Sequence, residues 1–336
     1  MKNTFGNAVT VTLFGESHGK AVGAVIDGLS PGIPIDEEYI REKMNLRKAY
    51  GKISTARQEE DEVKFISGVF QGHSTGTPLT LLIENQNTKS EDYGSRMHLP
   101  RPSHADYTGH CKYGGYEDYR GGGHFSGRLT LGLVTAGVVA KLILKKLYKN
   151  KIKFDTVLSE IGGCADPDRF PEIIEEALRT QDSVGGIVEC TASGVPVGLG
   201  EPFFDSAESV MSHLLYSVPA VKAVEFGLGF GSAKLHGSEN NDPIMSPDGA
   251  TATNHSGGIV GGITNGNPVV VRVAVKPTSS ISSPQLTLNT ETGTPERLVI
   301  KGRHDACIAM RAVVVIESAV AAALCDLALV AKSQGL

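Results

Sequence analysis

The chain has 336 residues, of which 40% are hydrophobic and 21% are charged, so it is long and apolar enough to bury a globular core. Its formal net charge of −5 excludes a general attraction to nucleic acid or to an anionic membrane surface. Five widely spaced cysteines without a CxxC pair exclude a disulfide framework and a zinc knuckle, which favours the reducing cytoplasm.

The spacing of apolar residues predicts the secondary structure. Runs rich in β-branched residues predict strands at 11–14, 21–28, 62–70, 79–84, 185–191, 223–230 and 269–276. Helical spacing and terminal charges predict helices at 35–48, 128–149, 208–218 and 309–332. The last segment is strongly apolar, but Glu317 and Asp326 within it favour a core helix over a membrane span. Residues 1–20 also lack the pattern of a signal peptide, so we expect no membrane association.

The order of these elements predicts the fold class. Strands and helices follow one another without a regular βαβ cadence, and no GxGxxG motif lies between a strand and a helix. No linker-like stretch divides the chain. We therefore predict one domain over residues 1–336, of the α+β class, built as a sandwich of β-sheets and α-helices and distinct from a Rossmann fold.

Three polar clusters interrupt the apolar framework. The first is "GESHG" at 15–19, the second runs from Arg101 to Arg128 almost without aliphatic residues, and the third is "KGRHDACIAMR" at 301–311. The second cluster ends in a triple glycine and Ser126 where the long helix at 128–149 begins. Free backbone N–H groups and the helix dipole favour anions at such a position. The pattern therefore predicts an anion-binding site there.

Basic residues are concentrated between positions 41 and 57. Two interpretations are open: a solvated helix face followed by a polar loop, or a binding surface on which arginine forks hold phosphate or carboxylate groups. The residues concerned are Arg41, Lys43, Arg47, Lys48, Lys52 and Arg57.

His18 and His104 lie among glycine, serine and proline residues in predicted loops. A lone histidine is more often a structural residue, but functional residues concentrate in such loops, and a histidine near an anion site suits general acid chemistry. Metal binding is the competing interpretation, because Glu16 and His18 could chelate from a strand. No third ligand follows at a recognised spacing, so we predict no metal site.

Glycine is unusually frequent, with 40 residues or about 12%, against an average near 7%. Two glycine- or hydroxyl-rich segments, "NHSGGIVGGITNG" at 254–266 and "VKPTSSI" at 275–281, supply small residues and phosphate donors. They suit a flat ligand that carries a phosphate group.

Taken in order, these motifs closely resemble the chorismate synthase family. The resemblance runs from "GESHG" through "RPSHADYT", "YRGGGHFSGR", "VPVGLGEP", "NHSGGIVGGITNG" and "KPTSSI" to "KGRHDACIAMRAVVVIE", and so spans nearly the whole chain. It implies a carbon–oxygen lyase that converts 5-enolpyruvylshikimate 3-phosphate to chorismate and phosphate by a 1,4-anti elimination in the shikimate pathway, which leads to the aromatic amino acids. It further implies reduced FMN as cofactor without net redox change, a homotetramer, and NADPH as an external or intrinsic reductant, with a separate flavin reductase as a further partner.

The resemblance also implies roles for individual residues. His18 is expected to act as the acid near the leaving phosphate and His104 to protonate or stabilise the reduced flavin. Asp305 is expected to help remove a proton through the flavin N5, assisted by Ser17 and Ser126. Substrate anions are expected to contact Arg47, Arg101 and Arg128. FMN contacts are expected from Ser126, Pro219, Ala220, Gly261, Lys276, Pro277, Thr278, Ser279, Ser280 and Arg303.

The chain departs from the usual family pattern after the triple glycine, at His124, Phe125, Gly127 and Leu129. The basic doublet near position 47 is also reduced to "NLRK", and Lys52 stands at a position that is frequently arginine. Two alternatives to the lyase follow from the residues and the resemblance. One is a catalytically silent flavin- or phosphate-binding protein with a role in assembly or regulation. The other is a flavin reductase that consumes NADPH.

Overall fold

A computed structural model describes residues 2–47, 61–86, 98–300 and 304–335. The first of its two large sheets comes from the N-terminal quarter of the chain. All its strands are antiparallel, and in β7 every second residue is buried, namely Leu79, Leu81 and Ile83. The strand order is β1 (Thr4–Phe5), β2 (Thr10–Gly15), β3 (Ala21–Asp27), β7 (Leu79–Glu84) and β4 (Lys64–Ser67).

The second large sheet is also antiparallel, and its central strand β13 buries alternate valines at 269, 271, 273 and 275. Alternation of this kind places one apolar face against a neighbouring layer. The order is β10 (Val221–Phe226), β13 (Val269–Val275), β9 (Gly186–Ser193) and β8 (Lys153–Ile161).

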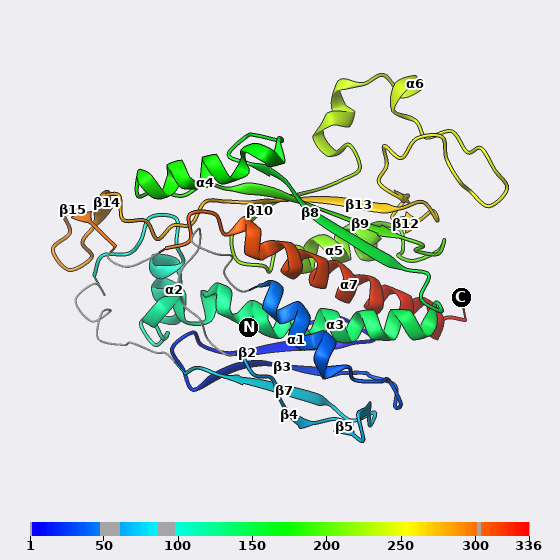
Figure 1. Cartoon of the computed structure of the whole chain (residues 1–336), viewed down its shortest axis with the longest axis horizontal. Coiled ribbons are helices and arrows are strands. Elements are labelled where there is room, and N and C mark those ends of the chain that lie inside the picture. Colours follow the sequence, from blue (N-terminus) through cyan, green and yellow to red (C-terminus); the bar gives the residue numbers. More distant parts are fainter. Residues whose placement is uncertain (1, 48–60, 87–97, 301–303, 336) are drawn as a thin grey trace.

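Helices fill the space between the two sheets (Figure 1). The long helices α3 (Thr130–Leu147) and α7 (Ala309–Ser333) pack against each other; α3 also contacts β3 of the first sheet, and α7 contacts β8 and β9 of the second. Helix α1 (Glu37–Leu46) packs on α3, and α5 (Ala207–Leu215) packs on α7. The α+β sandwich predicted from the sequence is therefore confirmed.

The two long helices meet at an unusually short separation. A Cβ atom added to Gly137 would lie 2.3 Å from the Cβ of Ser318, so only glycine fits at this point of α3. Both helices are long and apolar enough to cross a membrane, yet 78% and 83% of their most apolar windows are buried within the fold. They are core helices, as predicted for 309–332.

The acidic residues of α7 have buried partners. The Asp326 carboxylate accepts hydrogen bonds from the backbone N–H groups of Asn7, Ala8 and Val9 at 2.7–3.0 Å. Glu317 pairs with Lys141 of α3 and lies 3.5 Å from Lys43 of α1. The contacts of Glu317 therefore connect α1 and α3 to α7. The hydrogen bonds of Asp326 hold the N-terminal segment 7–9 against α7.

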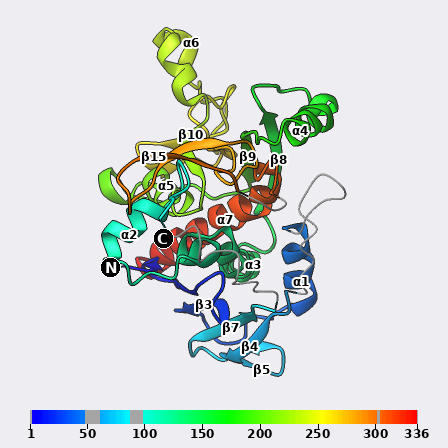
Figure 2. The ribbon, with the colours of Figure 1, turned by 90° about the vertical axis from the view of Figure 1, so that its left-hand side faces the viewer.

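Smaller elements surround this sandwich. Figure 2 shows α6 projecting from the body, and α2 near the N-terminus. The remaining helices are α2 (Asp106–Tyr113), α4 (Phe170–Arg179) and α6 (Gly237–Asn240), with 3-10 turns η3 (Arg120–Phe125), η4 (Gly127–Leu129), η5 (Pro167–Arg169), η6 (Phe203–Asp205) and η7 (Gly229–Lys234). Short strand pairs are β5 (Val69–Phe70) with β6 (His73–Ser74), β11 (Ile259–Val260) with β12 (Ile263–Thr264), and β14 (Gln285–Leu288) with β15 (Pro295–Leu298).

Two predicted strands are shorter than expected. The run at 62–70 is divided at Gly68, which has a φ of +83°. The run at 223–230 ends as β10 at Phe226, and a 3-10 turn begins at Gly229. In both cases a glycine in or near the apolar run allows the chain to leave the extended conformation.

Candidate active site

A cavity of about 970 Å³ opens at one end of the helical layer. Residues at the start of α3, from Ser126 to Thr130, line one part of it, and Ile308, Arg311 and Ala312 at the start of α7 line another. The two N-terminal helix ends therefore face the same space. Their free N–H groups and positive dipole ends favour a negatively charged ligand.

The "GESHG" loop follows β2 at the edge of this cavity. The backbone N–H of Ser17 donates to Gly123 O at 3.0 Å, and the Asn85 side chain donates to Glu16 O and Gly19 O at 3.0 and 2.9 Å. Ser17 and His18 are both buried. The loop is thus held by the backbone of Gly123 and by the side chain of Asn85, and the backbone carbonyl of Glu16 is one of the acceptors in this network.

The triple glycine separates the two predicted catalytic histidines. Gly121, Gly122 and Gly123 all have positive φ values, between 51° and 85°. A Cβ on Gly121 would lie 2.1 Å from the His18 ring, and one on Gly122 would lie 3.2 Å from the His104 ring. Because both imidazoles contact the same short glycine run, His18 and His104 lie on neighbouring parts of the site.

His104 belongs to a compact polar group at the start of α2. The Asp106 carboxylate lies 2.6 Å from His104 Nδ1 and accepts two hydrogen bonds from the Arg101 guanidinium at 2.7 Å. Burial opposes ionisation of Asp106, but hydrogen bonds from Arg101 and His104 outweigh it and lower the pKa of Asp106 well below its usual range. Arg101 Nη1 also donates to Ser280 Oγ at 3.0 Å.

The other two predicted substrate arginines lie near the start of α3. Arg47 donates to Thr130 Oγ1 at 2.8 Å and to Gly127 O at 2.6 Å. Arg128 pairs with Asp61 at 3.1 Å and donates to the Asn85 side chain. Arg128 therefore connects the start of α3 to the asparagine that holds the "GESHG" loop.

Asp305 lies just before α7, and Arg311, one turn into that helix, donates to its Oδ1 at 3.0 Å. On another side of the cavity, Lys276 contacts Ser279 Oγ at 2.9 Å, and residues 276–280 all line the space. Lysine and hydroxyl donors in one segment are suited to a phosphate or a polyhydroxyl chain.

The cavity carries an excess of positive charge. Among the described residues, seven lysine or arginine side chains line it against two acidic ones, Asp61 and Asp305, although the whole chain is acidic. The pKa of Arg47 is lowered to about 10, chiefly by burial; Asp61 opposes this shift, while Arg311 and Arg128 add to it. Burial, followed by the charge of Lys222, lowers the pKa of Lys276. An anionic ligand would relieve this repulsion among cations.

The structure brings most of the predicted site residues together. Gly261 does not line the cavity; it lies in the β11–β12 turn, whose next residue, Gly262, accepts a hydrogen bond from the N-terminus of α5. His18 lies behind Gly121 and is not itself a lining residue. Arg303, Lys48, Lys52 and Arg57 lie outside the described residues. The lining residues are Ser17, Arg47, Arg101, His104, Ser126, Arg128, Pro219, Ala220, Lys276, Pro277, Thr278, Ser279, Ser280 and Asp305.

Sequence reasoning did not single out Asp61, Asn85, Asp106 or Arg311. Asp106 and Arg311 stand inside the quoted motifs "RPSHADYT" and "KGRHDACIAMR", and an acidic residue two positions after His104 was a usable clue. Asp61 and Asn85 adjoin predicted strands, and only the fold brings them to Arg128.

The atypical residues after the triple glycine have structural partners. His124 Nδ1 lies 2.8 Å from Gly15 O and so attaches this segment to the end of β2. The Phe125 ring packs against Gly109 and Tyr113 of α2. Leu129 is buried in the main core. These substitutions support the walls of the cavity without removing any of the predicted catalytic side chains.

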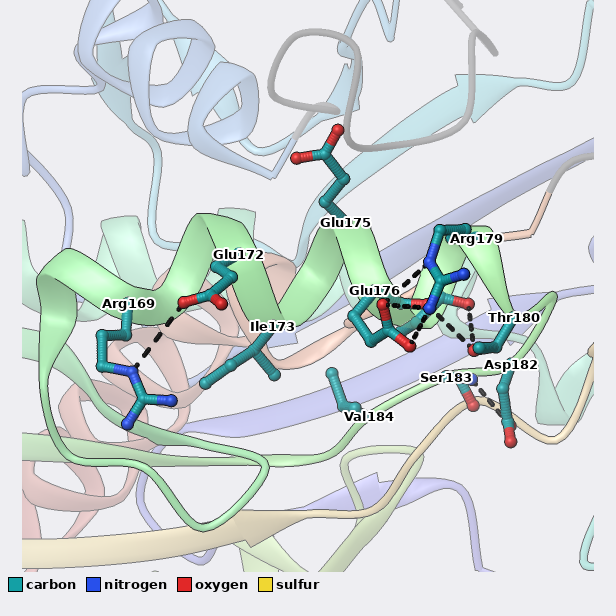
Figure 3. Close-up of a pocket in the computed structure, with 11 residues that line it drawn as sticks. Arg169, Glu172, Ile173, Glu175, Glu176, Arg179, Thr180, Asp182, Ser183 and Val184 are labelled. Carbon is teal, nitrogen blue, oxygen red and sulfur yellow. Dashed lines mark hydrogen bonds and ion pairs between the residues drawn. The ribbon is translucent and has the colours of Figure 1, made fainter.

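A second, smaller hollow of about 640 Å³ is lined by residues of α4 and of the segments beside it (Figure 3). Both of its arginines pair with glutamates of the hollow: Arg169 lies 3.9 Å from Glu172, and Arg179 lies 2.6 Å from Glu176. None of the predicted site residues lines it. Within the described ranges, no group of three or more His, Cys, Asp or Glu side chains is arranged to hold a metal ion.

Comparison with known proteins identifies the family. The family model described as chorismate synthase matches residues 9–329. The chain belongs to the chorismate synthase family. It is 53% identical to a chorismate synthase of Chitinophaga pinensis and 45% identical to one of Thermococcus kodakarensis, over 96% of this chain and 96% of the relative in both cases. A crystal structure of a chorismate synthase matches with a TM-score of 0.75 and 27% identity, covering 97% of this chain and 93% of that one.

The contact between Gly121 and His18 leads to a stability prediction for this chorismate synthase family member. Gly121→Ala combines a left-handed backbone, costing about 1–2 kcal/mol, with a steric clash against a buried ring that adds roughly 1–3 kcal/mol. Gly114→Ala is the matched control, because Gly114 has a φ of +63° and its nearest contact is at 4.0 Å. Urea unfolding should give Gly121→Ala the larger loss of unfolding free energy. Equal losses for the two variants would show that His18 does not pack on Gly121.

Proposed function

We propose that the protein is a carbon–oxygen lyase that converts 5-enolpyruvylshikimate 3-phosphate to chorismate and phosphate, as a step of the shikimate pathway. The observation that carries this proposal is that His104 and Asp305 line one cation-rich cavity at two helix N-termini, with the His18 ring packed directly behind the lining residue Gly121. Such a site suits a substrate that carries a phosphate and carboxylates and releases phosphate as its leaving group.

The residues present fit reduced FMN as the cofactor. Lys276, Thr278, Ser279 and Ser280 offer a cation and hydroxyl donors along one side of the cavity, and Pro219 and Ala220 offer backbone beside them. The repulsion between Lys276 and Lys222 is the kind that a phosphate group relieves. When bound, reduced FMN supplies electron density for the departure of phosphate without net oxidation.

The side chains of this chain would then have separate tasks. His18 supplies a proton on the leaving-phosphate side, and Arg47 and Arg128 offset the negative charge that develops there. Ser17 assists Asp305. His104, held beside Gly122, faces the cavity as a second proton donor. Asp305, which accepts a hydrogen bond from Arg311, holds the proton lost from the substrate, and Ser126 assists from the start of α3.

Chorismate formation under anaerobic conditions with chemically reduced FMN is the direct assay. We expect turnover in the native protein and a loss of about 10²-fold or more in both His18→Ala and His104→Ala, as for removed general acids. His110→Ala is the control, since His110 is an exposed histidine of α2 outside the cavity. A loss below tenfold in either catalytic variant would refute the role of that histidine.

The same assay separates the alternatives. Normal FMN binding without chorismate formation would contradict the lyase and favour a silent binding protein. NADPH consumption with oxidised FMN alone would indicate an intrinsic flavin reductase activity, whereas its absence would require a separate reductase as partner. We place the reaction in the cytoplasm, which is supported by five free cysteines, three of them buried.

We propose that the chain forms one domain over residues 1–336, because one buried cluster includes residues of both large sheets. We further propose that four such chains form a homotetramer. Large apolar side chains are exposed around η6 and η7, including Phe203, Phe204 and Phe230, and such patches mark protein interfaces. Light scattering of the native protein should give a mass four times that of one chain. The double variant Phe203→Ser/Phe204→Ser should give a lower mass, because it removes apolar contacts from the proposed interface. A monomer mass in the native protein would contradict this assembly.

A further inference from the structure

The polar group at the start of α2 contains an acid to which none of the functional assignments gives a role. Asp106 is the first residue of α2, where the helix dipole favours a carboxylate. Its Oδ2 accepts hydrogen bonds from the Arg101 backbone N–H at 3.0 Å and from Arg101 Nε at 2.7 Å. Its Oδ1 accepts from Arg101 Nη2 at 2.7 Å. The carboxylate is therefore held as an anion in one orientation.

Two groups compete for the same nitrogen of His104. Asp106 Oδ1 lies 2.6 Å from Nδ1, and Arg101 Nη2 lies 3.1 Å from it. The carboxylate can only accept a hydrogen bond from Nδ1–H, whereas the guanidinium can only donate one to a bare Nδ1. The anion is closer, and a charged acceptor favours a bound N–H strongly. The contacts thus select the tautomer with its proton on Nδ1.

We propose that Asp106 is a positioning residue that keeps the proton of His104 on Nδ1 and so turns Nε2 into the group available to the cavity. The His104 ring is partly buried and packs on Gly122, which restricts its rotation away from Asp106 and Arg101. In the neutral ring Nε2 is then the nitrogen that takes up a proton, and in the charged ring it is the one that gives a proton up. This role rests on the proposed lyase function of His104, but the tautomer itself does not.

Asp106→Asn tests the proposal with little change of shape. The amide oxygen, in the place of Oδ2, still accepts from the Arg101 backbone N–H and Nε, while the amide NH₂, in the place of Oδ1, faces Nδ1 and no longer accepts from Arg101 Nη2. Both the NH₂ and the released Nη2 then donate towards Nδ1 and favour the opposite tautomer. We expect kcat to fall by about 10²-fold with KM changed less than about fivefold, since a wrong histidine tautomer costs a large factor in other enzymes. In a His104→Ala background the same substitution should cost no further kcat. A further loss in that background would indicate a merely structural role and overturn the proposal.

Glu117→Gln is the matched control. Glu117 Oε1 lies 3.1 Å from Nδ1 of His110, a carboxylate–histidine pair that involves the same helix but lies away from the cavity. This variant should leave kcat and the His104 ring unchanged. A loss of kcat as large as that of Asp106→Asn would overturn the proposal, because it would reflect disturbance of α2.

The protonation of the ring can be observed without any catalysis. Solid-state ¹⁵N NMR of the full chain with ring-labelled histidine, assigned by comparison with His104→Ala, should show the His104 proton on Nδ1 in the native protein and on Nε2 in Asp106→Asn. A native ring protonated on Nε2 would overturn the proposal whether or not the variant folds. Failure to form chorismate would instead bear on the lyase function and leave this readout intact.

Discussion

The close packing of α3 on α7 is the constraint on which the site depends. At Gly137 the two helices approach so closely that a single added carbon would overlap Ser318. This contact lets both helices lie in one layer between the sheets, with their N-terminal ends open to the same cavity (Figure 1). Residues that precede each helix, such as Ser126 and Asp305, are thereby brought to one cavity from distant positions in the sequence.

Charge compensation completes the site. Arg101, Arg128 and Arg311 are paired with Asp106, Asp61 and Asp305, respectively. These acids hold the arginines in place before a ligand arrives, while the lysines and Arg47 leave a net positive environment. A phosphate or carboxylate ligand would find donors that are already oriented, which lowers the cost of binding and of stabilising a leaving anion.

Much of this arrangement follows from the sequence, and the remainder depends on three-dimensional contacts. The run at 79–84 and the helix at 309–332 are evident from apolar spacing, and the motifs around His18, His104 and Asp305 indicate chemistry. Helix α2 is not evident, because "DYTGHCKY" has no apolar stripe. The triple glycine was expected to bind an anion at the start of a helix, yet it also separates His18 from His104. The partners of Arg128 are sequence-distant, so no local pattern predicts them.

The proposed function requires one cavity to hold both the cofactor and the substrate near the two histidines. A crystal structure of the protein with FMN and 5-enolpyruvylshikimate 3-phosphate tests it most directly. We expect electron density for both molecules within the cavity, with FMN along residues 276–280 and the substrate phosphate and carboxylates contacting the arginines at the start of α3 and in the "RPSHAD" segment. Density for either molecule only in the hollow beside α4, or at another surface, would contradict the account.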